Sequence, residues 1–158
     1  LASGSASGGS GNDTLWSIEH LIGSDHADQL SGDDGDNVLA GGSGNDLLAG
    51  GGGADAFRFD SLLNALTNHD TIADFTPGED RIELDDAIFS ALPAGPLAAE
   101  AFRSGAGLTA GDADDRLLYD TATGVLAYDP DGTGVRPAVA FATLSGAPDL
   151  AAIDIWVV

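Results

Sequence analysis

Hydrophobic residues are sparse and regularly spaced in the first third of the chain. One apolar side chain recurs at a nine-residue interval through four contiguous units, and glycine and acidic residues fill most positions between. The recurring apolar residues are Leu30, Leu39, Leu48 and Phe57, and Leu15 holds the same place in an earlier unit. The units cover residues 8–16, 23–31, 32–40, 41–49 and 50–58, with a six-residue insert at 17–22. A fixed short period of this kind indicates a solenoid, in which each unit adds one coil.

The other positions of the unit predict a turn that is rich in oxygen ligands. Glycines at the first, second and fourth positions permit a positive φ, so that six residues can form a tight turn. The sixth position holds a carboxylate or its amide in every unit: Asp13, Asp28, Asn37, Asp46 and Asp55. The last three residues form a short strand whose eighth-position side chain points inward. Stacked turns would bring carbonyl and carboxylate oxygens together, and such oxygens without imidazole or thiolate favour Ca²⁺.

Beyond residue 59 the pattern changes to that of ordinary short strands. Alternation at Ile72, Ile82 and Leu84 predicts strands joined by a turn at Pro77-Gly78, and Asp85 or Asp86 could cap a short helix through Leu92. Residues 116–128 carry a hairpin signature with its turn near 122–124, and residues 139–144 and 153–158 predict two further strands. We expect ten apolar residues to close the open end of the solenoid: Leu84, Phe89, Leu117, Tyr119, Leu126, Tyr128, Phe141, Leu144, Ile153 and Trp156.

The charge and residue types of the chain exclude several classes of function. Asp and Glu total 26 against five Arg and no Lys, which gives a formal net charge of −21 at pH 7. Such a surface repels nucleic acid and anionic membranes, because phosphate binding needs clustered Lys or Arg. Cysteine is absent, so neither a disulfide framework nor a thiolate zinc site is available. His-Glu-x-x-His and Gly-x-Ser-x-Gly do not occur, and we expect the chain not to be an enzyme.

The nonapeptide units resemble the G-G-x-G-x-D-x-U-x repeat of RTX (repeats-in-toxin) proteins. The resemblance implies an all-β fold, a parallel β-roll with Ca²⁺ between turns two repeats apart, and here a β-rich C-terminal cap with one or two short helices follows it. The implied sixth-position pairs are Asp13 with Asn37, Asp28 with Asp46, and Asn37 with Asp55. The implied carbonyl ligands come from the second and fourth positions: Gly9, Gly11, Ser24, His26, Asp33, Gly35, Gly42, Gly44, Gly51 and Gly53.

Three features depart from the RTX pattern. His26 replaces a fourth-position glycine, Asn37 is a neutral ligand, and the insert at 17–22 breaks the period. Several other aspartates nevertheless crowd the turn of Asn37: Asp33, Asp34 and Asp36. A flexible glycine-rich linker is the alternative interpretation, but a linker does not keep Asp and Leu at fixed offsets through four contiguous units.

Two later segments also contain candidate calcium ligands. The run from Asp70 to Leu84 resembles the D-x-I-x-D-F-x-x-G-x-D-x-I-D-L run of serralysin-type proteases, which implies a further calcium site with Asp70 and Asp80. The alternative is that these aspartates only form turns and caps. Residues 129–134 partly resemble the start of an EF-hand loop, but residue 140 is Ala where that loop carries Glu. We therefore interpret residues 129–134 as a turn.

The end of the chain, Asp154 followed by four apolar residues, resembles the C-terminal signal that type I secretion transporters read. A final core strand would have the same pattern. We divide the chain into a linker at 1–7, a calcium-binding β-roll at 8–59 and a capping and secretion-signal region at 60–158.

These features together predict a module of a larger bacterial protein that binds several Ca²⁺ ions and folds on calcium outside the cell. Its partner would be a type I secretion transporter, without nucleic acid or membrane insertion, and any catalytic domain would lie upstream. The alternative is a calcium-dependent polysaccharide- or surface-binding module appended to a secreted enzyme or adhesin.

Overall fold

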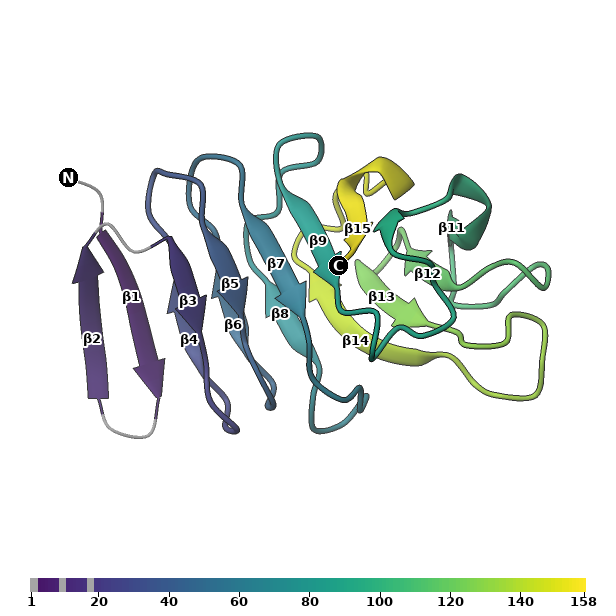
Figure 1. Ribbon diagram of the computed structural model, residues 1–158, viewed down its shortest axis with the longest axis horizontal. Coiled ribbons are helices and arrows are strands. Elements are labelled where there is room, and N and C mark those ends of the chain that lie inside the picture. Colours follow the sequence, from purple (N-terminus) through teal and green to yellow (C-terminus); the bar gives the residue numbers. More distant parts are fainter. Residues whose placement is uncertain (1–2, 9–10, 17–18) are drawn as a thin grey trace.

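The computed structural model describes residues 3–8, 11–16 and 19–158, the first two ranges by their backbone alone. These residues form fifteen strands and two short 3-10 helices, which confirms the predicted all-β class. Within these ranges no helix is long and apolar enough to cross a membrane. The strands stack along the long axis of the molecule, with an N-terminal hairpin at one end and a C-terminal cap at the other (Figure 1).

Seven short strands between residues 20 and 84 form the predicted parallel β-roll (Figure 1). Successive strands alternate between two sheets, so each strand pairs in parallel with the strand two coils away, as Leu30 with Leu48 and Val38 with Ala56. One sheet contains β3 (His20–Ile22), β5 (Val38–Ala40), β7 (Ala56–Phe59) and β9 (Arg81–Leu84). The other contains β4 (Gln29–Ser31), β6 (Leu47–Ala49) and β8 (Asp70–Ile72). The parallel pairing therefore continues past residue 59, where the repeats end, through β8 and β9.

The roll has a narrow core: β7 and β9 bury a second large side chain, Phe59 and Leu84, and every strand buries one large apolar side chain that aligns with that of the strand it pairs with. Each of these side chains is at most 3% exposed: Leu21, Leu30, Leu39, Leu48, Phe57, Ile72 and Ile82. Four of them occupy the eighth position of a repeat, as predicted. Burial of one such side chain contributes about 1.5–3 kcal/mol, while each coil must order nine or more residues at about 1–2 kcal/mol per backbone residue. The core alone is therefore too thin to hold the coils together.

The start of the chain differs from the prediction. The described residues of the unit at 8–16 do not form a coil of the roll; β1 (Ser3–Gly8) and β2 (Gly11–Trp16) form an antiparallel hairpin, and β1 pairs antiparallel with β4. The position next to β5 belongs to β3, which lies entirely in the segment interpreted as an insert, residues 17–22. The reason is local: Glu19-His20-Leu21 has the same acidic-x-apolar spacing as positions six to eight, and Leu21 aligns with Leu39. Gly9 lies outside the described residues.

The cap completes both sheets of the roll. β14 (Val139–Leu144) pairs in parallel with β8, and β15 (Ile155–Val157) pairs in parallel with β9. The predicted hairpin is present as β12 (Leu117–Asp120) and β13 (Val125–Tyr128), with Gly124 at φ 76° in its turn. The remaining elements are β10 (Gly95–Pro96), β11 (Phe102–Gly105), and the 3-10 helices η1 (Ala99–Ala101) and η2 (Ala152–Asp154). The last coil of the roll is thus covered, which a solenoid requires.

An aromatic cluster forms the core of the cap. Phe141 packs edge-on against Phe59, at a ring centroid distance of 4.9 Å, and against Phe89, at 5.2 Å. Eight of the ten expected capping residues are buried. The other two, Ile153 and Trp156, are 80% and 43% exposed. The strand alternates with a period of two, so Ile155 and Val157 face the core in their place and Trp156 faces outward.

The helix expected through Leu92 after Asp85 or Asp86 does not form. Asp85 does cap the segment, because its Oδ1 accepts a hydrogen bond from the Ala87 backbone N–H at 2.9 Å. The residues that follow form only hydrogen-bonded turns, with Phe89 N–H donating to the Asp85 carbonyl. Pro93 leaves too few residues for a regular helix to propagate.

Candidate metal centres

The sixth-position side chains form two columns, one along each edge of the roll. The edge-one column contains Asp28, Asp46 and Asp70; the edge-two column contains Asn37, Asp55 and Asp80. In each column a carboxylate oxygen of one coil accepts a hydrogen bond from the backbone N–H of the sixth-position residue two coils earlier. The N···O distances are 2.8 Å for Asp28–Asp46, 3.1 Å for Asp46–Asp70, 2.8 Å for Asn37–Asp55 and 3.0 Å for Asp55–Asp80.

Two of the three implied pairs, Asp28 with Asp46 and Asn37 with Asp55, therefore lie together. The third does not. Asp13 lies on β2, which among the described strands pairs with β1 alone, and Gly11 lies in the same hairpin. Glu19 takes the place expected for Asp13: its backbone carbonyl accepts the hydrogen bond from the Val38 N–H, next to Asn37, at 2.6 Å.

Two of the second carboxylate oxygens in these columns have a local partner. The Oδ2 of Asp28 accepts the Ser24 N–H at 2.6 Å, and the Oδ2 of Asp80 accepts the Thr76 N–H at 2.7 Å. Asp46 differs, because its Oδ2 is buried and has no hydrogen-bond partner among the described residues. A buried carboxylate oxygen is costly without a donor or a cation. The centre of the edge-one column therefore contains an oxygen that a metal ion would satisfy.

The expected carbonyl ligands stack in the same two columns. Ser24, His26, Gly42 and Gly44 lie on edge one, and Asp33, Gly35, Gly51 and Gly53 lie on edge two. The stacking is close: a Cβ added to Gly51 would lie 2.1 Å from the Asp33 carbonyl oxygen, and Gly51 has φ 99°. Only glycine fits such a position. His26 is accommodated because its turn avoids positive φ, and its side chain is exposed.

The electrostatics of the columns are unfavourable for four buried carboxylates. Burial raises the pKa of Asp46 and Asp80, and raises that of Asp55 to about 6 and that of Asp70 to about 7. Backbone hydrogen bonds partly offset this, but neighbouring carboxylates add to it: Asp28 acts on Asp46, and Asp80 acts on Asp55. A cation between the coils would reverse both effects.

The donor chemistry fits Ca²⁺ better than other metals. Among residues 19–158 no group of three or more His, Asp or Glu side chains is placed to hold a metal by itself. An ion in either column would therefore take backbone carbonyls together with one or two carboxylates. Ca²⁺ accepts about 6–8 such oxygens in flexible geometry. Asp28, Asp46 and Asp70 with the nearby carbonyls would hold it on edge one, and Asn37, Asp55 and Asp80 on edge two.

The structure adds ligands or supporting groups that the repeat pattern misses. Asn68, which is buried, accepts the Gly44 N–H at 3.0 Å, and the Ser61 hydroxyl donates to the Gly42 carbonyl at 2.6 Å. Asp74 accepts the N–H groups of Gly50 and Gly51. Asp70 and Asp80 themselves extend different columns and do not share one site, since β8 and β9 lie in different sheets. The signal for both was present in Asp70-Thr71-Ile72 and Asp80-Arg81-Ile82, which repeat the spacing of positions six to eight.

Protons should partly replace calcium in these columns. In metal-free buffer at pH 7.5 we expect little parallel β-structure, and on acidification to pH 5 we expect part of it to return. The sign follows from Asp70 and Asp55: their folded pKa values lie above the ordinary value of 3.8, so the folded state binds more protons, and its stability falls as the pH rises from about 4 to about 7. Circular dichroism against pH measures this change.

Asp70→Asn is the matched variant, because it removes the charge without changing the size of the side chain. It should stabilise the metal-free protein at pH 7.5 and flatten the pH dependence. Loss of β-structure on acidification would contradict the expectation.

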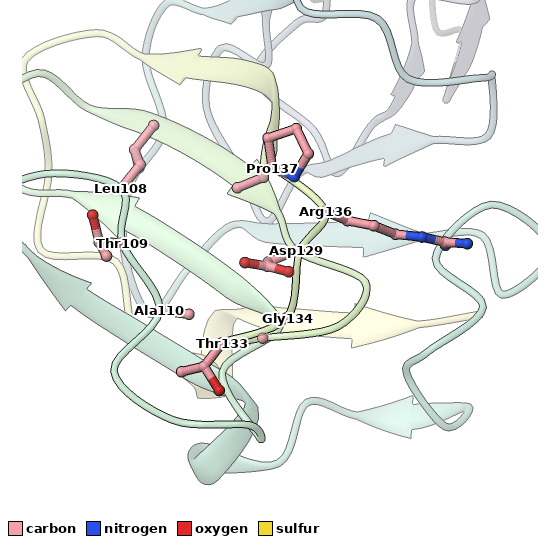
Figure 2. Close-up of a pocket in the computed structure, with 10 residues that line it drawn as sticks. Leu108, Thr109, Ala110, Asp129, Thr133, Gly134, Arg136 and Pro137 are labelled. Atoms are coloured by element: carbon pink, nitrogen blue, oxygen red, sulfur yellow. The ribbon is translucent and has the colours of Figure 1, made fainter.

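A pocket in the cap is another concave feature that contains charged residues (Figure 2). It has a volume of about 360 Å³ between the loop at 108–110 and the loop that joins β13 to β14. Asp129, which is 4% exposed, lies between these loops, and its Oδ1 accepts the Asp131 N–H at 3.1 Å. Residues 130–136 form bends, as the interpretation of 129–134 as a turn requires.

The match to a protein family agrees with the repeat geometry. Residues 4–92 match the family model described as Peptidase M10 serralysin C terminal. Among solved structures, the solution structure of the AlgE6R3 subunit from the Azotobacter vinelandii mannuronan C5-epimerase is 29% identical over 86% of this chain and 76% of that chain, with a TM-score of 0.42. No curated protein matches the chain. The family match covers the whole roll, including both columns, and is to a C-terminal module and not to a catalytic domain. The chain therefore belongs to the serralysin C-terminal family of β-roll modules.

Proposed function

We propose that this chain is a calcium-dependent folding and export module: its roll folds when it meets Ca²⁺ outside the bacterial cell, and its C-terminus is the address for a type I secretion transporter. The observation that carries the proposal is the pair of carboxylate columns. Buried acidic side chains of coils two apart face one another, and the buried Oδ2 of Asp46 has no protein donor in the described residues. A folded roll therefore needs cations at these positions.

The driving force would be linkage between binding and folding. Without cations the buried carboxylates repel one another, and the narrow core does not offset the ordering of the glycine-rich turns. Each site would stabilise the folded state by about 1.4 kcal/mol for every tenfold excess of free calcium over its dissociation constant. Site constants on the order of 10⁻⁴–10⁻³ M, as in other extracellular modules, would keep the chain unfolded in a calcium-poor cytosol and folded outside.

The position of the C-terminal strand supports this order of events. β15 lies between β10 and β9, with hydrogen-bonded partners on both edges. Ile155 and Val157 are at most 2% exposed, and Asp154 accepts the Gly78 N–H at 3.0 Å. A transporter that reads these residues would have to engage them before the cap forms. Calcium-driven folding would then bury Ile155 and Val157 of the secretion signal once export is complete.

Deletion of residues 153–158 tests the address and the strand separately. Export from a host with a type I system should stop, because the terminal residues are missing. In vitro, calcium-driven folding should weaken and persist, since both columns remain while β9 and β10 lose their shared neighbour. Export is measured as protein in the medium, and folding as the calcium midpoint in circular dichroism. Normal export of the truncated chain would place the address elsewhere.

A further inference from the structure

The outer face of one sheet carries a row of charged and aromatic side chains across three adjacent strands. Arg58 on β7 is the cross-strand partner of Glu83 on β9, and Glu83 is the partner of Trp156 on β15. β9 lies between the other two strands in Figure 1. Arg81 lies two residues before Glu83 and therefore on the same face. We call Arg58, Arg81, Glu83 and Trp156 the arginine–tryptophan patch.

Glu83 holds both arginine side chains in place. Its carboxylate is buried and accepts hydrogen bonds from Arg58 Nε at 3.0 Å, Arg58 Nη2 at 2.6 Å and Arg81 Nε at 2.8 Å. Burial by itself would raise the pKa of Glu83, but the hydrogen bonds and charges of the two arginines bring it below its ordinary value. At neutral pH the patch therefore contains two positive charges and one negative charge.

The arrangement leaves donors free on the outer side. Both terminal nitrogens of Arg81 and Nη1 of Arg58 make no hydrogen bond to the described residues. The side chains of Arg58 and Arg81 are about two-fifths exposed, as is Trp156. A shallow pocket of about 360 Å³ is lined by Arg81, Glu83, Trp156 and Val158. The patch is thus a local cationic surface with an exposed indole, in a chain whose net charge is −21.

We propose that the arginine–tryptophan patch binds a carboxylate-bearing sugar, a uronate unit of an acidic polysaccharide. The pair of free terminal nitrogens on Arg81 matches the two oxygens of a carboxylate, which a guanidinium binds in a bidentate manner. The exposed indole offers a flat apolar surface against which the C–H face of a pyranose ring can pack. Glu83 fixes the guanidinium groups in advance, which lowers the ordering cost of binding. The inference needs only the folded roll with its cap and does not depend on the export role.

The experiment is a titration of the calcium-folded protein with an oligomer of three galacturonate units. The Trp16→Phe background leaves Trp156 as the only tryptophan of two, so its fluorescence reports binding at the patch. A short oligomer is used because the net charge of −21 repels long polyanions. We expect saturable binding, and at least tenfold weaker binding for Arg81→Gln in the same fluorescence titration. Trp156→Ala removes the reporter, so its binding is measured by calorimetric titration beside the parent protein, and it should also be at least tenfold weaker.

Arg136→Gln is the matched control, because it removes the same charge from an exposed loop of the cap. Circular dichroism and the calcium midpoint of every variant show whether the roll is still folded, so failure of folding is recognised separately. The proposal is overturned by any of four results: no binding at millimolar oligomer, equal binding of the methyl-esterified oligomer, an equal loss in Arg136→Gln, or tighter binding of a peptide with a free C-terminal carboxylate.

Discussion

Removal of calcium abolishes the parallel β-structure of the roll, and its return restores that structure: this is the largest effect we expect. The coils between residues 20 and 84 carry only one or two large buried side chains each, whereas both edges carry buried carboxylates that repel one another. Without cations the folded roll therefore loses electrostatic stability that its core cannot replace. Far-ultraviolet circular dichroism during titration with a chelator, and then with excess Ca²⁺, measures the change.

The cap should respond to the same titration. β14 and β15 pair with β8 and β9, so loss of the roll removes the strands on which the cap is built. Fluorescence of Trp156 should therefore change at the same calcium concentration as the far-ultraviolet signal. Mg²⁺ at equal concentration should not restore either signal, because it requires octahedral geometry at about 2.0–2.1 Å and retains its waters. A spectrum that is unchanged by chelator would refute calcium-dependent folding.

The second large effect is expected at Asp46. Its Oδ1 accepts the Asp28 N–H, its own N–H donates to Asp70, and its Oδ2 is buried without a partner. Asp46 therefore faces both neighbouring coils of the edge-one column. Asp46→Asn keeps the size of the side chain and removes the charge, and we expect the calcium midpoint to rise at least tenfold, equivalent to about 1.4 kcal/mol or more. The midpoint is read from circular dichroism or calorimetric titration.

The control for Asp46 is Asp149→Asn, which removes one charge from an exposed residue outside both columns. Its midpoint should change less than twofold, since a surface charge is screened. The double variant Asp28→Asn/Asp46→Asn should show less than the sum of the single effects, because the two residues belong to one site. Equal shifts in Asp46→Asn and Asp149→Asn would mean that bulk charge, and not coordination, sets the calcium dependence.

The sequence by itself determined the roll and most of its columns. The nine-residue period places the eighth-position residue inward and the sixth-position residue at the end of each turn, and alternation between two sheets brings Asp28 to Asp46 and Asn37 to Asp55. These contacts follow from local geometry repeated at a constant interval, so no long-range information is needed. The hairpin of the cap and its turn at Gly124 were local in the same sense.

Only the tertiary structure decided what happens where the interval changes. Asp70 lies 24 residues after Asp46, and Asp80 lies 25 residues after Asp55. These intervals differ from the 18 residues between paired positions in the repeats, so the period did not predict that Asp70 and Asp80 belong to two separate columns. The choice of Ile155 and Val157 over Ile153 and Trp156 depended on how η2 meets β15. Arg58, Glu83 and Trp156 are far apart in the chain, and they form one row only because parallel stacking aligns β7, β9 and β15. A period predicts contacts between equal coils, whereas contacts between unequal coils depend on how the whole chain packs.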